Sequence, residues 1–288
     1  LYLDLHLHHQ KLQCFVISGD EDVNLGTVAT ANAIDASAST GIITATLGAN
    51  AKAITGGTGA DQITLNSGTR AHTVDGGAGI DTFTITATAQ GASINGNAGN
   101  DIFNIADADT LVLLGGAGND TFNMNANTIN STIIGGEGTD IMAFDAGAAN
   151  LGAAFTASGI ESLNISAVNN TVTFTHGQFA GLTSAIVTGD AVADKILVNV
   201  GVGAAGGTLD ASGLTKAALS TSDIIYAANS TGSDIITGGV AAETFNLDVI
   251  RGADQIEGGA TGIDLLTSSD TTVTETGSAA STGVVLNM

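Results

Sequence analysis

The sequence GGAGIDTFTI occupies residues 76–85, and four further segments of the chain follow the same pattern. They are GGTGADQITL at 56–65, GNAGNDIFNI at 96–105, GGAGNDTFNM at 115–124 and GGEGTDIMAF at 135–144. Their aspartates, Asp61, Asp81, Asp101, Asp120 and Asp140, are separated by 20, 20, 19 and 20 residues. A period this short and this regular indicates a solenoid, in which each repeat forms one coil.

Each repeat predicts a turn followed by a short strand. Glycines permit a sharp turn and leave backbone carbonyls unshielded, and the apolar residues after each aspartate alternate, as in a strand with one buried face. We expect second strands near 72–74, 93–95, 111–114 and 132–134. Stacked coils about 4.8 Å apart would place Phe83, Phe103 and Phe122 in one interior column. The predicted fold is all-β, a parallel β-roll or β-helix solenoid stabilised by calcium.

The charge of the chain limits its partners. Six Lys and Arg residues face 28 Asp and Glu residues, for a formal net charge of −22 over 288 residues. Nucleic acid and anionic membranes are unsuitable partners because their binding needs a basic surface. Cys14 is the single cysteine, so no disulfide can form within the chain, and no apolar run reaches the roughly 18 residues of a membrane span. Divalent cations are the simplest means of neutralising rows of carboxylates.

Four segments follow from the pattern. Residues 1–20 contain His6, His8 and His9, do not resemble a signal peptide, and are expected to be disordered or atypical. Residues 21–144 are expected to form a roll with one calcium loop per coil of about twenty residues. Residues 145–229 lack the loop motif and predict a calcium-poor β-helix or a β-sandwich segment. Residues 230–288 predict a second roll and C-terminal strands.

The five segments closely resemble the nonapeptide GGxGxDxUx, where U is large and apolar, of RTX proteins. Residues 238–267 resemble it more loosely, with Glu243 in place of one aspartate, and together these stretches cover under half of the chain. Residues 34–37, 159–165 and 208–212 resemble segments of RTX-containing bacterial surface-layer proteins. The resemblance implies a parallel β-roll with calcium between successive loops, type I secretion by an uncleaved C-terminal signal, and an extracellular or cell-surface location.

This chain departs from the RTX pattern in its spacing. Most RTX rolls have a loop every nine residues, on both sides of the roll, whereas residues 56–144 have one loop per coil. Calcium is therefore expected along one edge only in this stretch. Asn97 also replaces a glycine in the third repeat.

The proposed ligands follow from the coordination that calcium requires. Calcium takes 6–8 oxygen ligands, which two stacked loops supply through carbonyls and aspartates, so five loops leave four gaps. The predicted metal residues are Asp61, Asp81, Asp101, Asp120, Asp140, Gly57, Gly59, Gly77, Gly79, Gly99, Gly116, Gly118, Gly136, Gly138, Asp234, Asp254 and Asp264.

The expected function is structural: a calcium-binding subunit that self-assembles into a surface layer, filament or matrix, with cell-surface polysaccharide as a further partner. One alternative is a secreted adhesin or an ice- or sugar-binding module, because threonines alternate along 82–88. Another is the RTX module of a polysaccharide-acting enzyme, for which Arg70 and His72 are the one basic pair of interest. No zinc-protease motif HExxH is present, and we expect no enzymatic activity.

Overall fold

The computed structural model places the described residues in two compact units. One comprises Leu1–Ala143 and Asn150–Ile160, the other Phe144–Ala149 and Glu161–Met288. The described residues are 2–8, 11–29, 31, 33–48, 51, 53–66, 72–86, 91–106, 110–124, 128–144, 150–152, 154–165, 171–179, 182, 186–189, 195–200, 208–211, 215–216, 223–228, 235–237, 244–247, 255–257, 264–268 and 284–287. The fold is an all-β solenoid of parallel strands, as the repeat predicts.

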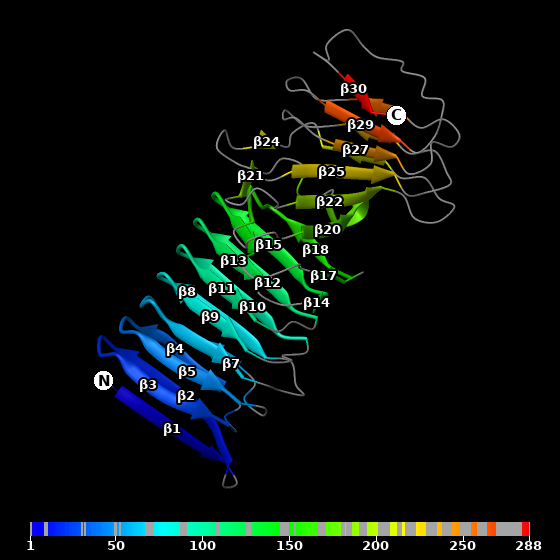
Figure 1. The fold of residues 1–288 in the computed structure, drawn as a ribbon. Helices are drawn as coiled ribbons and strands as arrows, with labels where there is room; N and C mark the ends of the chain where they lie inside the picture. The colour runs from blue at the N-terminus through cyan, green and yellow to red at the C-terminus, as the bar shows by residue number, and fades with distance from the viewer. Residues whose placement is uncertain are drawn as a thin grey trace. The chain divides into compact units, whose positions relative to one another are not determined.

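The first unit consists of two sheets whose strands, apart from β1, run parallel, and successive coils contribute one strand to each sheet (Figure 1). One sheet contains β1 (Tyr2–His8), β2 (Lys11–Gly19), β4 (Ala33–Ser39), β6 (Ala53–Thr55), β8 (Thr73–Ala78), β10 (Ser93–Ala98), β12 (Val112–Ala117), β15 (Thr132–Glu137) and β18 (Thr156–Ser158). The other contains β3 (Val23–Val28), β5 (Ile43–Leu47), β7 (Gln62–Leu65), β9 (Thr82–Ile85), β11 (Ile102–Ile105), β13 (Thr121–Met124) and β16 (Ile141–Phe144). The short strands β14 (Thr128–Ile129) and β17 (Asn150–Leu151) also pair in parallel.

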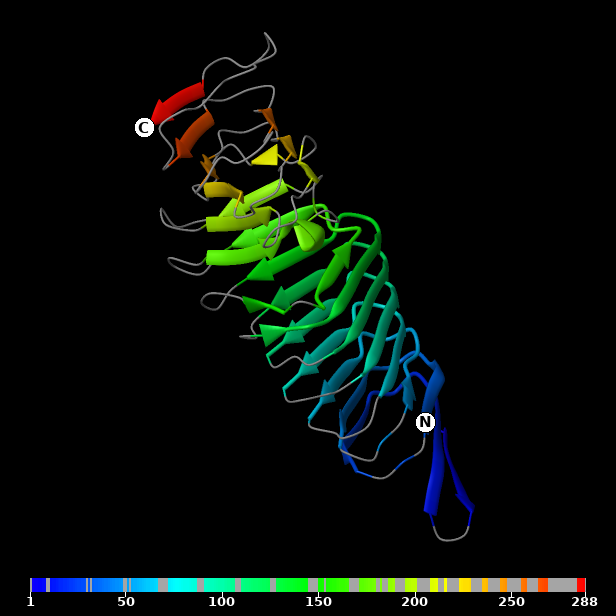
Figure 2. The ribbon, with the colours of Figure 1, turned by 90° about the vertical axis from the view of Figure 1, so that its right-hand side faces the viewer.

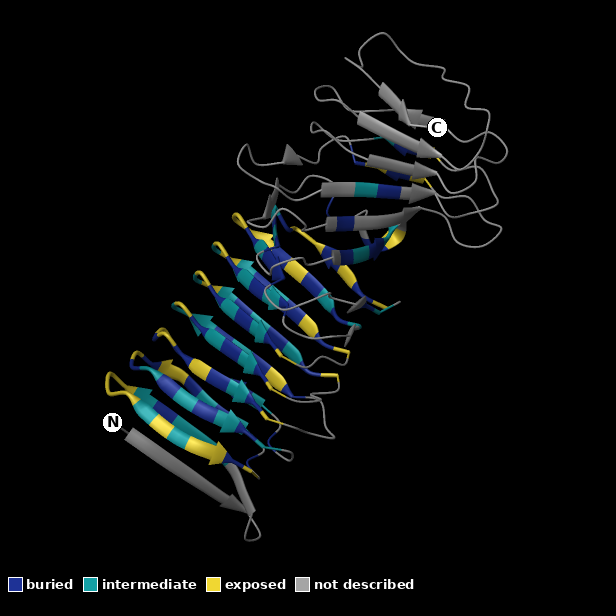
Figure 3. Cartoon of the chain, viewed as in Figure 1, coloured by how far each residue is buried: buried dark blue, intermediate teal, exposed yellow. Residues whose placement is uncertain are grey.

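The core of this unit lies between the two sheets, where residues one coil apart stack in columns. Phe103 pairs in register with Phe83 and with Phe122, and the ring centroids are 4.9 and 4.7 Å apart. The predicted phenylalanine column is therefore confirmed. Along β9 and β11 buried positions alternate with partly exposed ones, and the same alternation of colours is visible on the central strands of this unit in Figure 3.

The strands that precede the loops are longer than the sequence suggests. The predicted segments near 93–95 and 132–134 correspond to β10 and β15, but both strands continue through the first two residues of the following loop, Gly96 and Asn97 in β10 and Gly135 and Gly136 in β15. The pairing of Gly116 with Gly136 in adjacent coils explains the extension, because two bare backbones can keep strand spacing through the start of the turn. In these two loops the turn itself thus begins near the fourth residue of the motif, whereas β6 ends at Thr55, before the first loop.

Strands β1 and β2 pair antiparallel at the N-terminal end of this unit (Figure 2). The remaining described registers of the unit are parallel, so β1 runs against the direction of its sheet. Within the described residues, the outer edges of β1 and β3 pair with no further strand.

The second unit is also built of parallel strands in the residues that are described. One group is β19 (Ser162–Ile165), β21 (Ile186–Gly189) and β24 (Thr215–Lys216); another is β23 (Thr208–Asp210), β26 (Ile235–Thr237) and β28 (Gln255–Glu257). The third is β20 (Thr171–Thr175), β22 (Lys195–Val200), β25 (Asp223–Ala228), β27 (Thr244–Leu247), β29 (Asp264–Ser268) and β30 (Val284–Asn287). Parallel pairing is the arrangement of a β-helix rather than of a sandwich. The short helix α1 (His176–Phe179) follows β20, and no helix among the described residues is long and apolar enough to cross a membrane.

Candidate functional site: a buried aspartate ladder

The five glycine-aspartate loops stack one above another at one edge of the first unit, and we call them the loop row. They comprise residues 56–61, 76–81, 96–101, 115–120 and 135–140. Neighbouring loops are joined by backbone hydrogen bonds, such as those from Gly79 N to Ala98 O at 2.9 Å and from Gly99 N to Ala117 O at 2.9 Å. The sequence prediction that these loops form a continuous row is therefore confirmed by the register of the strands that flank them.

Most of the predicted loop glycines adopt a backbone conformation that other residues avoid. Positive φ values between 99° and 143° occur at Gly77, Gly79, Gly99, Gly116, Gly118, Gly136 and Gly138. Gly57 and Gly59, in the first loop, have no positive φ but are closely packed, since a Cβ on Gly57 would lie 2.0 Å from Ser39 O. Asn97 takes φ 71° at the position where the other repeats have glycine. Asparagine tolerates this left-handed region better than most residues do, which explains why the repeat survives the substitution.

The aspartates of the loop row, Asp61, Asp81, Asp101, Asp120 and Asp140, form what we call the aspartate ladder. All five side chains are fully buried, at 0% exposure. One carboxylate oxygen of each, Oδ1, accepts a hydrogen bond from a backbone N–H of the preceding coil. The donors to Asp81, Asp101, Asp120 and Asp140 are the backbone N–H groups of Asp61, Asp81, Asp101 and Asp120, each at 2.8 Å, and Ile43 N donates to Asp61 at 2.7 Å. Each aspartate thus ties its own coil to the one before it.

The second carboxylate oxygen has a different environment. Within the described residues, Oδ2 of Asp81, Asp101 and Asp120 has no hydrogen-bond partner, whereas Oδ2 of Asp61 accepts from Gly57 N at 3.1 Å. A buried carboxylate oxygen without a partner is costly. Three consecutive coils therefore each contain an oxygen that is suited to a ligand.

The first glycine of each motif lies beside the Oδ2 atom of the aspartate in the same loop. A Cβ built on Gly76 would lie 2.3 Å from Asp81 Oδ2 and 2.9 Å from the carbonyl oxygen of Gly96 in the next loop. The corresponding distances at Gly96 are 2.1 Å to Asp101 Oδ2 and 2.6 Å to Gly115 O. The carboxylate oxygen and the carbonyl oxygen of the next coil therefore both lie within 3 Å of the position that a Cβ would occupy, which leaves no room for a side chain on this glycine.

The metal-binding residues predicted from the sequence did not include these first glycines. The omitted positions are Gly56, Gly76, Gly96, Gly115 and Gly135. A signal for them was present, because the second position of the motif admits Asn97 while the first position is glycine in all five repeats.

Burial raises the pKa of four ladder carboxyls, those of Asp61, Asp81, Asp101 and Asp120. The pKa of Asp81 rises from 3.8 to about 7 and that of Asp120 to about 6, in both cases chiefly because the buried site disfavours the charged form. Neighbouring ladder carboxylates raise both values further, and the backbone hydrogen bonds partly oppose the rise. The pKa values of Asp61 and Asp101 are also raised by burial. A proton or a bound cation would therefore offset the cost of burying negative charge at these four positions.

The donors in the loop row fit calcium in kind. Carboxylate and carbonyl oxygens are the ligands that calcium prefers in proteins, and each interval between coils offers one of each. Nowhere among the described residues do three or more His, Cys, Asp or Glu side chains gather around one point. A cation here would be held by one ladder aspartate and by backbone carbonyls of the neighbouring loops.

The structure describes only the backbone of some of the other predicted site residues, and the rest lie outside the described residues. Asp234 and Asp254 lie outside the described residues, and so do Arg70 and His9. The backbone of Asp264 begins β29, where it pairs in register with Val284. His6 and His8 belong to the backbone of β1.

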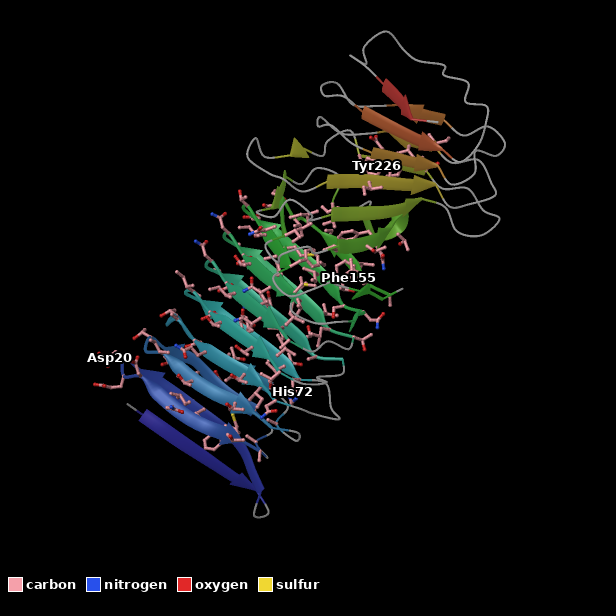
Figure 4. The ribbon with its side chains drawn as sticks, in the orientation of Figure 1. Asp20, His72, Phe155 and Tyr226 are labelled. Atoms are coloured by element: carbon pink, nitrogen blue, oxygen red, sulfur yellow. The ribbon has the colours of Figure 1, made fainter. Side chains whose placement is uncertain are left out.

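His72 lies away from the loop row, at the opposite end of the coils from Asp20, and both residues are marked in Figure 4. Its side chain is 1% exposed, and neither ring nitrogen forms a hydrogen bond of ordinary geometry with the described residues. Burial lowers the pKa of the imidazole, with a smaller opposing effect from the backbone of Ala51. A side chain this buried does not present its nitrogens to a substrate.

No protein-family model matches the chain, and the searches of curated proteins and of solved structures likewise gave no match.

Proposed function

We propose that this chain is a calcium-binding structural protein of the bacterial exterior, in which cations bound along the loop row stabilise the solenoid. The single observation that supports this most strongly is the unpartnered Oδ2 of Asp81, Asp101 and Asp120 beside a carbonyl of the next coil. The resemblance of the five loops to RTX repeats names calcium as the cation. The net charge of −22 further favours a calcium-rich exterior, where the cation would offset repulsion.

When bound, calcium would supply positive charge between carboxylates that are otherwise forced together. The chain itself contributes the rest of the site. The glycines bring carbonyls close to the aspartates, and the Oδ1 hydrogen bonds fix the orientation of each carboxylate. Because these bonds already hold the side chains in place, little further ordering is required on binding.

The test is thermal unfolding of the full chain, followed by circular dichroism, with calcium and with excess chelator. Ligand at about 100 times its Kd stabilises by about 2.7 kcal/mol per site, so several sites should raise the Tm by many degrees. Magnesium at the same concentration is the matched control, since it prefers a rigid octahedral shell and keeps its own waters. An equal Tm with calcium and with chelator would exclude the calcium part of the proposal.

Self-assembly is the second part of the proposed function, and open strand edges support it. The outer edges of β1 and β3 pair with nothing in the described part of the chain, and such edges readily accept a strand from another molecule. Electron microscopy of the purified chain with and without calcium tests this part. Ordered sheets or fibres that disappear on chelation are expected, and a monodisperse monomer in both conditions would refute it.

An adhesin is the second candidate, favoured by one surface. On the outer side of β5, β7, β9, β11 and β13, the in-register residues Thr46, Thr64, Thr84, Asn104 and Asn123 form a regular polar row. Asn123 Nδ2 donates to Asn104 Oδ1 at 2.8 Å, which holds part of the row in place. Retention of the chain on insoluble polysaccharide, lost in a Thr64→Lys, Thr84→Lys double variant, would favour this candidate.

A further inference from the structure

The fifth loop of the loop row is followed by a turn that lacks the glycine-aspartate motif. In this turn β18 leads into Gly159 and Ile160. β18 pairs with β15 in register, with Ile134 opposite Ser158. The coil that contains β18, which we call the sixth coil counted from the first motif loop, therefore continues the stack beside the loop row. From the sequence, the five motif loops suggest four gaps and give this turn no role.

The turn nevertheless places a carbonyl where the motif loops place theirs. A Cβ on Gly135 would lie 1.8 Å from Gly159 O and 2.3 Å from Asp140 Oδ2. At Gly115 the same construction gives 2.4 Å to Gly135 O and 2.2 Å to Asp120 Oδ2. The fifth loop therefore faces the sixth coil with the same pair of oxygens that the fourth loop presents to the fifth.

The conformation of Gly159 accounts for this placement. Its φ of 62° lies in the left-handed region, which is reached at low cost by glycine, and its own Cβ position is 3.2 Å from Gly136 N. The backbone thus turns closely over the fifth loop. At this turn Gly159 alone supplies the carbonyl that a motif glycine supplies in the other loops.

We infer that Asp140 and the Gly159 carbonyl hold a fifth divalent cation, between the fifth loop and the sixth coil. The inference rests on the proposed calcium function and extends it to a coil without a motif aspartate. It assigns one ladder aspartate to each ion, through the pairs Asp61–Gly76, Asp81–Gly96, Asp101–Gly115, Asp120–Gly135 and Asp140–Gly159. In the arrangement suggested by sequence, an ion needs two motif loops, and only four ions fit.

The experiment counts calcium bound to the full chain by equilibrium dialysis and elemental analysis. The wild type is compared with a variant in which all five ladder aspartates are asparagine. Asparagine keeps an Oδ1 acceptor for the backbone N–H of the preceding coil but has no charge, and circular dichroism verifies that the variant folds. Any ions bound after residue 230 are common to both chains and cancel in the difference.

The expected difference is five ions per chain. A difference of four would overturn the inference while leaving the calcium function intact, and a difference of zero would overturn both. If the variant does not fold, a crystal structure of the wild type grown with calcium decides. An anomalous-scattering peak about 2.3–2.6 Å from Gly159 O supports the fifth site, and peaks confined to the first four intervals refute it.

Discussion

The aspartate ladder predicts that the calcium-free protein becomes less stable as the pH rises toward neutrality. In the folded state the pKa of Asp81 is raised to about 7, above the value near 3.8 that it has when unfolded. Between these values the folded chain retains a proton that the unfolded chain releases, so stability falls as pH rises from about 4 to about 7. Below pH 4 both states are protonated, and this source of instability vanishes.

The expected loss is several kcal/mol. A pKa raised from 3.8 to about 7 corresponds to about 4 kcal/mol for Asp81, and a rise to about 6 corresponds to about 3 kcal/mol for Asp120. The two carboxyls interact, so they titrate together and the two figures do not simply add. Saturating calcium should abolish the loss, because the cation replaces the protons.

The assay is chemical denaturation in chelator at several pH values between 4 and 7.5, for the wild type and for Asp81→Asn. Asparagine preserves the acceptor for Asp61 N but never ionises, so the variant should lose less stability over this range. Titration of other groups, including His72, affects both chains equally and cancels in the comparison. Equal pH dependence in the two chains, or a wild type whose stability rises steadily with pH, would refute the reasoning.

Three further changes test the packing around the ladder and the core. Gly76→Ala should destabilise the chain by at least the 1–3 kcal/mol typical of overpacking, because its Cβ would meet Asp81 Oδ2 at 2.3 Å; Gly177→Ala, with no atom within 4 Å of its Cβ, is the control, and equal effects in denaturation would contradict the prediction. Phe103→Ala should cost about 3–5 kcal/mol in the same assay, since its ring is fully buried in a column; a loss below 1 kcal/mol would mean that the column is not packed as described. His72→Leu should become more stable relative to wild type as the pH falls below 6.5, because burial lowers the pKa of the imidazole and protonation favours the unfolded state; a stability difference that is the same at pH 5 and pH 8 would contradict this.

Much of the fold was predictable because the solenoid repeats its own sequence. A period near twenty predicts the coils, and alternation after each aspartate predicts β9, β11 and β13 together with the column through Phe103. The glycine pairs were harder to place, because sequence associates them with turns although register keeps them in strands. The close approach of Gly159 to the fifth loop gives no local signal, since it depends on which coil lies beside this residue rather than on its neighbours in sequence.

The two oxygens of a ladder aspartate have different environments, which the sequence did not predict: Oδ1 accepts a backbone hydrogen bond, whereas Oδ2 of Asp81, Asp101 and Asp120 has no hydrogen-bond partner among the described residues. This difference helps to explain why these residues are acidic. Hydrogen bonding to a neighbouring coil needs no charge: Asn100 and Asn119, immediately before two ladder aspartates, accept 2.8 Å hydrogen bonds from Asn119 N and Thr139 N at exposed positions. Asparagine at the ladder positions would serve the same purpose without burying a charge, which costs several kcal/mol when uncompensated. The ladder is aspartate in all five loops, so hydrogen bonding alone does not account for it. A cation that uses the second oxygen does, because it turns the cost of buried negative charge into binding free energy.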